Sequence, residues 1–466
     1  MNQIREDVIH QCRHAYLIGI GGVGMSALAR VLKHQHLEVS GSDIRESART
    51  RELKQAGIPV AIGQSQVAFG DADLVIYSSA IRNEHLELLA ARASGLKVYH
   101  RAEILSSLLN RAKTSVAVAG THGKTTTASM ISFVLTELGK NPTCLVGGDV
   151  LNLGTNTVLG SDDLWVSEVD ESDQSHELYT PNYSVITNLE PDHLDHYEDM
   201  QAIRKSFEVF ISNGRDPGLV VYFNEDVGLR EIVSLSHCPA ISYGFSEEAD
   251  FSAGNICYMP FGLEFDLFEE SFFVTKVRLS VPGRHNIANA LACIAVTVQL
   301  GCEPEEVARI LTRFRGAGRR LEVKHESSEM IVIDDYAHHP TEVKASISAL
   351  KKSGKPLTVI FQPHRYSRTR YFLREFANAF DGADQLILTD IYSAGESNVH
   401  QIDISSLYHE IKNDIPVRIL RKQEIIPALC AEHNLNGIIA FLGAGDIGDI
   451  ADEFANRLKG AHPVAG

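Results

Sequence analysis

A glycine-rich segment between Val118 and Ile131 carries the residue types that hold nucleotide phosphates. The run Gly120-Thr-His-Gly-Lys-Thr-Thr follows a short apolar stretch that predicts a buried parallel strand, and helical periodicity resumes at Thr125. Amides of such a turn point at phosphates, and the helix N-terminus adds partial positive charge. Lys124 would reach the β- and γ-phosphates, and the Thr125 hydroxyl would bind Mg²⁺. The segment therefore predicts a nucleoside triphosphate site, although Val118 replaces a glycine of the longer common motif.

Candidate metal ligands follow the next two predicted strands. Glu168 lies in the acidic segment that ends the strand Leu164–Val169, and His193 follows the strand Tyr183–Thr187. The carboxyl ends of parallel strands meet at one edge of a sheet, so both side chains are expected beside Thr125 as ligands of Mg²⁺. Mg²⁺ prefers oxygen ligands, so the residues alone leave His193 open between a ligand and a solvated loop histidine. The remaining acids of the first segment are equally compatible with a solvated surface.

A second glycine turn lies near the N-terminus. Gly19-Ile-Gly-Gly-Val-Gly24 follows the predicted strand Ala15–Ile20, and Asp43 stands 19 residues after Gly24 at the end of the next strand. This spacing satisfies the dinucleotide fingerprint, including the distal acid for a ribose hydroxyl. It is compatible with an NAD-dependent oxidoreductase, with a UDP-linked substrate, and with a tight turn that binds nothing.

Polar clusters also follow two strands of the C-terminal third, at Asp334–Pro340 and Gln362–Arg368. The preceding segment Gly316–Arg320 predicts a hinge, because glycines supply backbone freedom and arginines supply donors for phosphate. His285 and Asn289 lie near the start of a long alanine-rich helix, where they are either helix caps or nucleotide contacts.

The strand and helix patterns predict an α/β protein with three domains. Short alternating segments between Phe251 and Val281 suggest antiparallel strands on the flank of the second domain. In the third domain, one helix is expected over Tyr371–Phe380. The expected domains are a Rossmann-like domain (residues 1–111), a central P-loop ATPase-like domain (112–316) and a second Rossmann-like domain (317–466).

Composition limits the partners of the chain. The net charge of −17, with 60 acidic and 43 basic residues, argues against nucleic acid or an anionic membrane as the main partner. The longest uncharged run, Asn286–Cys302, contains several polar residues and predicts a buried helix, not a membrane span. Seven scattered cysteines without C-x-x-C fit a reducing compartment, and the charged N-terminus shows no signal peptide. We therefore expect a cytoplasmic protein without membrane insertion.

Eight ordered motifs resemble those of the Mur ligases of bacterial peptidoglycan synthesis, over essentially the whole chain. They are G-I-G-G-V-G-M-S (19–26), S-G-S-D (40–43), G-T-H-G-K-T-T-T (120–127), E-V-D-E-S-D (168–173), T-N-L-E-P-D-H-L-D-H (187–196), P-G-R-H-N-I-A-N-A (282–290), D-D-Y-A-H-H-P-T-E (334–342) and F-Q-P-H-R-Y-S-R-T (361–369). The resemblance implies a bacterial enzyme in which ATP phosphorylates the lactyl carboxylate of UDP-N-acetylmuramate. An amine then attacks the acyl phosphate, giving an amide, ADP and phosphate. The last motif favours L-alanine as the acceptor over the preformed peptide that a sister ligase uses.

The resemblance also implies roles for individual residues. At the ATP site it implies Gly120, Thr121, His122, Gly123, Lys124, Thr125, Thr126, His285, Asn289, Arg320 and Asp335. Along the UDP-sugar it implies Gly21, Gly22, Val23, Gly24 and Asp43, and on the amino-acid side Tyr336, His338, His364, Arg365 and Arg368, with an arginine pairing the carboxylate. It implies Thr125, Glu168 and His193 as ligands of two Mg²⁺ ions, for which Mn²⁺ can substitute. The implied catalytic residues are Lys124, His193, His338 and Arg365.

Two positions depart from the family pattern, and two rival functions stay open. Ala27 replaces a common glycine, and Gln64 replaces a common histidine, so no contact is assigned to Gln64. An NAD-dependent dehydrogenase would leave Lys124, Glu168 and His193 unexplained. A non-catalytic nucleotide switch would leave unexplained the two polar-edged α/β units that flank the P-loop unit.

Overall fold

The computed structural model describes residues 9, 11–63, 69–192, 197–216, 218–259, 261–399, 401–411, 415–432 and 435–461. The chain divides into two compact units. Unit 1 comprises residues 1–254, 266–275 and 288–311, and unit 2 comprises residues 255–265, 276–287 and 312–466. Within the described ranges, no helix combines the length and the apolar character that crossing a bilayer requires.

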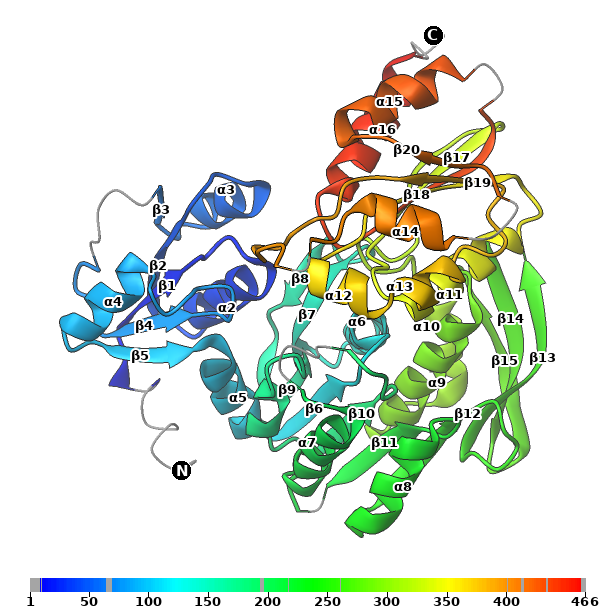
Figure 1. The fold of residues 1–466 in the computed structure, drawn as a ribbon. Helices are drawn as coiled ribbons and strands as arrows, with labels where there is room; N and C mark the ends of the chain where they lie inside the picture. Colours follow the sequence, from blue (N-terminus) through cyan, green and yellow to red (C-terminus); the bar gives the residue numbers. More distant parts are fainter. Residues whose placement is uncertain are drawn as a thin grey trace, which may run out of the picture. The chain divides into compact units, whose positions relative to one another are not determined.

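The first sheet has five parallel strands in the order β3-β2-β1-β4-β5, drawn in blue and cyan in Figure 1. Its elements are β1 (His14–Ile18), α2 (Val23–His34), β2 (Glu38–Asp43), α3 (Ala48–Gln55), β3 (Val60–Ile62), β4 (Leu74–Tyr77), α4 (Leu86–Ala93), β5 (Lys97–His100) and α5 (Arg101–Arg111). The predicted Rossmann-like fold of this part of the chain is therefore confirmed. Helix α2 buries Leu28 and Leu32 against this sheet, and it also contacts β7 and β8 of the second sheet.

The second sheet has ten strands in the order β15-β14-β13-β12-β11-β10-β6-β9-β7-β8. Its elements are β6 (Thr114–Ala119), α6 (Lys124–Glu137), β7 (Pro142–Val150), β8 (Thr155–Val158), β9 (Ser161–Glu168), the 3-10 helix η1 (Ser175–Leu178), β10 (Tyr183–Ile186), α7 (Met200–Ser212), β11 (Leu219–Phe223), α8 (Val227–Ser236), β12 (Ala240–Gly244), β13 (Phe251–Met259), β14 (Gly262–Glu269), β15 (Phe272–Leu279), α9 (Arg284–Gln299) and α10 (Pro304–Leu311).

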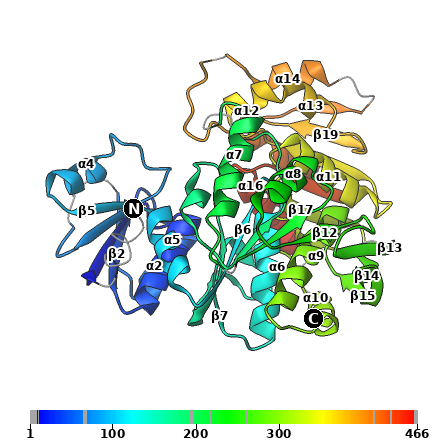
Figure 2. The same cartoon turned by 90° about the horizontal axis from the view of Figure 1, so that it is seen from below.

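Strand β6 occupies the position in this sheet that matters for the site. It pairs in parallel with both β9 and β10, so the ends of all three strands meet the turn before α6 at one edge. Helix α6, labelled in Figure 2, starts at Lys124, directly after the turn. Residues 125–135 of this helix are all buried. The strand–turn–helix prediction for this segment is thus confirmed.

The third sheet lies in unit 2 and has the order β16-β17-β21-β18-β19-β20. Its elements are β16 (Glu322–Glu326), β17 (Met330–Asp335), α11 (Pro340–Lys351), β18 (Leu357–Phe361), α12 (Tyr366–Tyr371), α13 (Leu373–Ala377), β19 (Gln385–Leu388), α14 (Ile404–Glu410), β20 (Val417–Ile419), α15 (Lys422–Ala431), β21 (Gly437–Leu442) and α16 (Ile447–Ala461). Within the described residues, neighbouring strands of this sheet are parallel, except that β16 and β17 are antiparallel. Successive strand residues enter separate cores on the two faces, as Ile333 and Val332 do.

One predicted element is wrong. The single helix expected over Tyr371–Phe380 is two short helices, α12 and α13, separated at Phe372 with φ −101° and ψ 24°. The Phe372 ring is 7% exposed and packs on the His339 ring, with centroids 4.5 Å apart. Phe372, Phe376 and Phe380 are buried in the same core, so their spacing in the sequence resembles that of one continuous helix. In the structure, two short helices with a kink between them bury the three rings.

Candidate active site

Lys124 is the first residue of α6, directly after the turn that was predicted to bind phosphate, and its ammonium group is fully paired. Its Nζ donates to the carbonyls of Gly120 at 2.6 Å and Thr121 at 3.1 Å, and to Glu171 Oε1 at 2.7 Å. Burial lowers the pKa of Lys124, but the carboxylates of Glu171 and Glu168 outweigh burial and raise it above its usual value. The lysine is therefore charged at neutral pH and can neutralise a phosphoryl group.

The turn requires glycine at two positions. Gly120 has φ +122°, and a Cβ there would clash with the hydroxyl of Thr187. Gly123 has φ +83°, and a Cβ there would lie 2.6 Å from Asn289 Oδ1. This amide oxygen accepts a hydrogen bond from Thr127 Oγ1 at 3.2 Å, so Asn289 of α9 lies against the turn.

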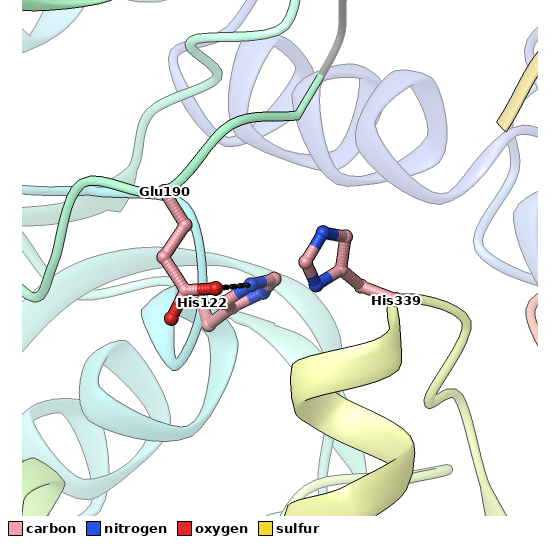
Figure 3. A group of neighbouring side chains, drawn as sticks. All are labelled: His122, Glu190 and His339. Atoms are coloured by element: carbon pink, nitrogen blue, oxygen red, sulfur yellow. Dashed lines mark ion pairs between the residues drawn. The ribbon is translucent and has the colours of Figure 1, made fainter. Parts of the chain in front are cut away.

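The loop after β10 holds the Gly120–Gly123 turn through hydrogen bonds. The amides of Thr121 and His122 donate to the carbonyl and the side-chain oxygen of Asn188, at 3.0 and 2.9 Å. The amide of Glu190 donates to Thr121 Oγ1 at 2.9 Å, and its carboxylate lies 3.5 Å from His122 Nε2 (Figure 3). Asn188 therefore holds two consecutive amides of the turn in place.

Two of the three predicted metal ligands lie together. Thr125 Oγ1 donates to Glu168 Oε1 at 3.0 Å, and Glu168 Oε2 accepts from the amide of Gly147 at 2.7 Å. A hydroxyl and a carboxylate oxygen beside the predicted triphosphate site are donors that suit Mg²⁺. The third predicted ligand, His193, lies outside the described residues, as does Gln64. The metal site therefore stays a prediction.

Sequence reasoning missed the partner of Lys124. Glu171 is only 3% exposed, and burial, partly opposed by Lys124, raises its pKa to about 7. Tyr197 donates its hydroxyl to the Glu171 carbonyl at 2.7 Å, which fixes the backbone at this point. The acidic segment was equally compatible with a solvated surface, because the pairing of Glu171 with Lys124 is not visible in the sequence.

The predicted UDP-sugar residues form one turn in unit 1. The amide of Gly21 donates to Asp43 Oδ2 at 2.9 Å, so the carboxylate that was predicted to bind a ribose also holds the turn. Gly22 precedes α2, and a Cβ at Gly24 would lie 2.6 Å from Arg101 Nη1. Arg101, which sequence reasoning did not single out, also lies 3.9 Å from a carboxylate oxygen of Asp170.

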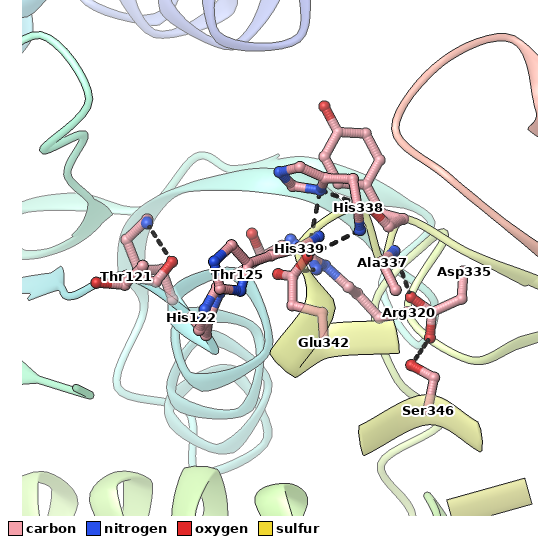
Figure 4. A network of polar contacts seen from close by, with 12 residues as sticks. Thr121, His122, Thr125, Arg320, Asp335, Ala337, His338, His339, Glu342 and Ser346 are labelled. Atoms are coloured by element: carbon pink, nitrogen blue, oxygen red, sulfur yellow. Dashed lines mark hydrogen bonds and ion pairs between the residues drawn. The ribbon is translucent and has the colours of Figure 1, made fainter. Parts of the chain in front are cut away.

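Asp335 of unit 2 is buried and engaged by its own sheet. Its carboxylate accepts from the amides of Leu321 and Ala337, at 3.1 and 2.8 Å, and from Ser346 Oγ at 3.0 Å (Figure 4). Burial raises its pKa to about 6, and Arg320 opposes this shift. The role of Asp335 at ATP stays a prediction, and its observed contacts hold the segment that carries Arg320.

Glu342 in the first turn of α11 organises the neighbouring side chains. It accepts from the amide of His338 at 3.0 Å, and its other oxygen lies 3.5 Å from Arg320 Nη1. The Arg320 guanidinium also lies over the Tyr336 ring, 5.2 Å from its centroid. Glu342 ends the motif at residues 334–342, yet its role was not predicted, because a contact with Arg320 is not visible in the sequence.

The predicted amino-acid residues of unit 2 lie close to one another. The His338 ring lies 5.3 Å from Tyr336 and 5.7 Å from His364. Arg368 Nη1 lies 3.2 Å from His364 Nδ1, and Arg365 Nη1 lies 3.8 Å from a carboxylate oxygen of Glu396. The last contact was not predicted. His285, also in unit 2, is exposed in the first turn of α9.

Comparisons with known proteins identify the class. Three family models match in order: Mur ligase family, catalytic domain (residues 14–113), Mur ligase middle domain (118–297) and Mur ligase, glutamate ligase domain (319–445). The UDP-N-acetylmuramate–L-alanine ligase of Hydrogenobaculum sp. (strain Y04AAS1) is 39% identical over 95% of this chain and 98% of its own. The enzyme of the same name from Aquifex aeolicus is 40% identical over 95% and 97%. This chain belongs to the Mur ligase family and is therefore a ligase.

A solved structure agrees with this assignment. The UDP-N-acetylmuramate–alanine ligase MurC from Thermotoga maritima is 31% identical, covers 96% of this chain and 100% of its own, and superposes with a TM-score of 0.83. A murein peptide ligase from Psychrobacter arcticus, at 22% identity and a TM-score of 0.73, shares the fold. The predicted three-part α/β architecture is thus confirmed, whereas the predicted domain boundaries stay predictions.

Proposed function

We propose that this chain uses ATP to join L-alanine to the lactyl carboxylate of UDP-N-acetylmuramate, in bacterial peptidoglycan synthesis. The observation that carries the proposal is the charged, buried Lys124 in a turn that also brings Thr125 and Glu168 together. The curated relatives of that name, similar over nearly the full length, support the choice of substrates. We expect the reaction to occur in the cytoplasm, where ATP and nucleotide sugars are available.

The chemistry explains why ATP is needed. A carboxylate is a poor acyl donor, because its leaving group would be oxide. Transfer of the γ-phosphoryl group of ATP to the lactyl carboxylate gives an acyl phosphate and ADP. The amine of alanine attacks the acyl carbon, the tetrahedral intermediate expels phosphate, and the amide forms. The enzyme contributes mainly by positioning the reactants and neutralising phosphate charge.

The P-loop residues have distinct roles in this proposal. Lys124 neutralises the transferring phosphoryl group, and Asn289 and the glycines of the turn shape the space for the phosphates. Thr125, Glu168 and His193 would hold Mg²⁺, which when bound spreads positive charge over the phosphate oxygens. The proposal needs no histidine or cysteine nucleophile, because the substrate carboxylate itself attacks the γ-phosphorus.

The other predicted residues orient the two remaining substrates. The turn Gly21–Gly24 and Asp43 would bind the UDP part, with the start of α2 facing the diphosphate. Arg365, Arg368 and the histidines His338 and His364 would form the alanine side. A guanidinium matches a carboxylate with two hydrogen bonds, so one arginine would pair the alanine carboxylate and leave its amine free to attack.

Release of ADP tests the proposal directly. The purified protein is incubated with ATP and Mg²⁺, with or without UDP-N-acetylmuramate, and with L-alanine, glycine, a tripeptide or no acceptor. We expect ADP release that requires both the UDP-sugar and L-alanine, with the amide product seen by mass spectrometry. A Lys124→Met preparation controls for contaminating ATPases. Release that only a peptide supports would favour the sister ligase, and no UDP-sugar-dependent release from folded protein would refute the proposal.

A further inference from the structure

A third glycine turn, Gly443-Ala-Gly-Asp-Ile-Gly448, connects β21 to α16 in unit 2. Strand β21 is buried and pairs in parallel with β17 and β18. Strand, glycine turn and helix thus satisfy the same dinucleotide spacing as the turn at Gly19–Gly24. The proposed function gives this turn no role.

Two amides and the one carboxylate of this turn already have protein partners, which argues against a phosphate site. The amide of Gly443 donates to the Asp335 carbonyl at 2.9 Å, and the amide of Ile447 donates to Gln362 Oε1 at 3.2 Å. The Asp446 carboxylate, at the start of α16, accepts from Gln362 Nε2 at 2.8 Å and Lys422 Nζ at 2.5 Å. A diphosphate here would meet a carboxylate in place of amide donors.

The carbonyls of the turn instead surround a guanidinium. Arg319 Nη2 donates to the Gly443 carbonyl at 2.7 Å, and Nη1 donates to the Gly445 carbonyl at 3.1 Å. Arg319 Nε donates to Asp334 Oδ2 at 3.1 Å. A Cβ on Gly448 would lie 2.8 Å from Arg319 Nε, so the glycine leaves room for this side chain. Three acceptors from two strand ends therefore match the planar fork of an arginine, which a lysine cannot reproduce.

Asp334 makes the contact costly to lose. Its side chain is 2% exposed, and burial raises its pKa to about 6 although Arg319 and Lys324 oppose the shift. Among the described residues, its Oδ1 has no hydrogen-bond partner. Without Arg319, a buried carboxyl group and two turn carbonyls would lose their donors.

The backbone of Arg319 transmits this anchoring to the neighbouring residues. Arg319 has φ +55°, its carbonyl accepts from the amide of Tyr336 at 2.7 Å, and its amide donates to Glu322 Oε2 at 2.8 Å. The guanidinium groups of Arg319 and of the next residue, Arg320, both lie 5.2 Å from the Tyr336 ring centroid. Fixing Arg319 therefore fixes the position from which Arg320 and Tyr336 project.

We propose that Arg319 is a positioning residue whose guanidinium fills the Gly443–Gly448 turn and thereby holds Arg320 and Tyr336 in place for catalysis. The part that concerns catalysis rests on the proposed function. The Gly443–Gly448 turn is then an internal binding site for the Arg319 guanidinium, and it binds no dinucleotide.

Steady-state kinetics test the positioning role. We compare Arg319→Ala and Arg319→Lys with Arg457→Ala, which removes an exposed arginine of α16 that pairs with Glu453 at 2.8 Å. Because a small misplacement of a positioning group is costly, we expect about a tenfold or larger rise in KM for ATP or fall in kcat for both Arg319 variants. The KM for UDP-N-acetylmuramate should change less than about twofold, since that site lies on other residues. Normal kinetics for Arg319→Ala, or an equal rise in KM for ATP, UDP-N-acetylmuramate and L-alanine, would overturn the proposal.

A second measurement does not depend on the reaction. Ethylguanidinium chloride at millimolar concentration should raise the melting temperature of Arg319→Ala by several degrees, relative to sodium chloride of equal ionic strength, and restore part of its turnover. It should not do so for Arg457→Ala. If ethylguanidinium does not raise the melting temperature of Arg319→Ala selectively, the turn is not a guanidinium site. This conclusion would hold even if the wild-type protein proved to be a different kind of ligase.

If Arg319→Ala does not fold, a double variant still tests the positioning role. Arg319→Ala/Asp334→Asn removes the unpaired buried carboxylate while it leaves the two turn carbonyls without Arg319. We expect this double variant to be folded and still defective in KM for ATP or in kcat. If the double variant is folded and has wild-type kinetics, Arg319 contributes only to stability and the positioning role is wrong.

Discussion

The buried pair of Lys124 and Glu171 gives a prediction for stability as well as activity. The Lys124→Met substitution keeps most of the stem volume but removes the ammonium that contacts Glu171 at 2.7 Å. The side chains are 14% and 4% exposed, so water cannot replace the missing partner well. Removing one member of a buried ion pair costs about 3–5 kcal/mol. We take the lower end, about 3 kcal/mol, which is roughly a 150-fold change in the unfolding equilibrium constant.

The cost should depend on pH with a defined sign. Burial already raises the folded-state pKa of Glu171 from 4.5 to about 7, and loss of Lys124 would raise it further. The folded state then binds more protons than the unfolded state, so stability falls as pH rises from about 4.5 through the folded pKa. At pH 5.5 the carboxyl is neutral in the folded protein, and we expect a cost of only about 1 kcal/mol. At pH 8.5 the full cost of about 3 kcal/mol should appear.

Urea unfolding followed by tryptophan fluorescence measures the stability cost of Lys124→Met close to the substituted residue. The chain has one tryptophan, Trp165, which is 1% exposed in β9, the strand that ends at Glu168. Lys54→Met is the matched control, because Lys54 is 39% exposed and pairs with Glu46 at 3.3 Å. Loss of such a surface pair should cost less than about 1 kcal/mol at either pH.

The double variant Lys124→Met/Glu171→Gln separates stability from catalysis. Its neutral pair should restore the unfolding free energy to within about 1 kcal/mol of the wild type. Ligation should stay abolished, because no charge faces the phosphoryl group, while UDP-sugar affinity should be retained. An equal cost for Lys124→Met at pH 5.5 and pH 8.5, or no recovery in the double variant, would refute the electrostatic reasoning.

Three further predictions follow from single positions. Glu168→Gln should raise the Mg²⁺ concentration needed for half-maximal turnover by about tenfold or more while leaving UDP-sugar binding intact; an unchanged Mg²⁺ titration would count against a metal role. His176 is fully buried against Phe207, and burial lowers its pKa from 6.5 to about 4, so the folded state binds fewer protons and stability falls as pH falls below 6.5. Between pH 7 and pH 5, the free energy of unfolding of His176→Gln should therefore fall by about 2 kcal/mol less than that of the wild type, as measured by urea unfolding. Gly120→Ala should stop ATP-dependent turnover, because its methyl group would clash with Thr187; normal turnover would show that the turn can adjust.

Local patterns predicted the elements of the site well. The apolar run before Gly120 and the periodicity after Thr125 are properties of neighbouring residues, and they correspond to β6 and α6. The parallel order of the strands follows from the alternation of strands and helices. These features depend on short stretches of sequence, which is why composition and spacing were sufficient to predict them.

Pairings between distant residues could not be predicted in the same way. Glu171 pairs with Lys124, which lies 47 positions earlier in the sequence. Glu396 lies near Arg365, although strand β19 separates the two residues in the sequence. An acidic residue in a polar segment has the same appearance whether it is solvated or buried. The kink at Phe372 was also missed, because phenylalanines at helical spacing can reach one core from two short helices.

The two glycine turns that share a six-residue spacing show what such a pattern can and cannot encode. At Gly19–Gly24 and Gly443–Gly448 the letters specify one backbone shape, a strand that reverses sharply into a helix. They do not specify which molecule the shape serves, since an arginine that precedes the second turn by more than a hundred residues occupies its carbonyls. A genome-wide pattern search would count this chain twice as a dinucleotide binder. Testing each match for an internal side chain that already fills it would remove the second count.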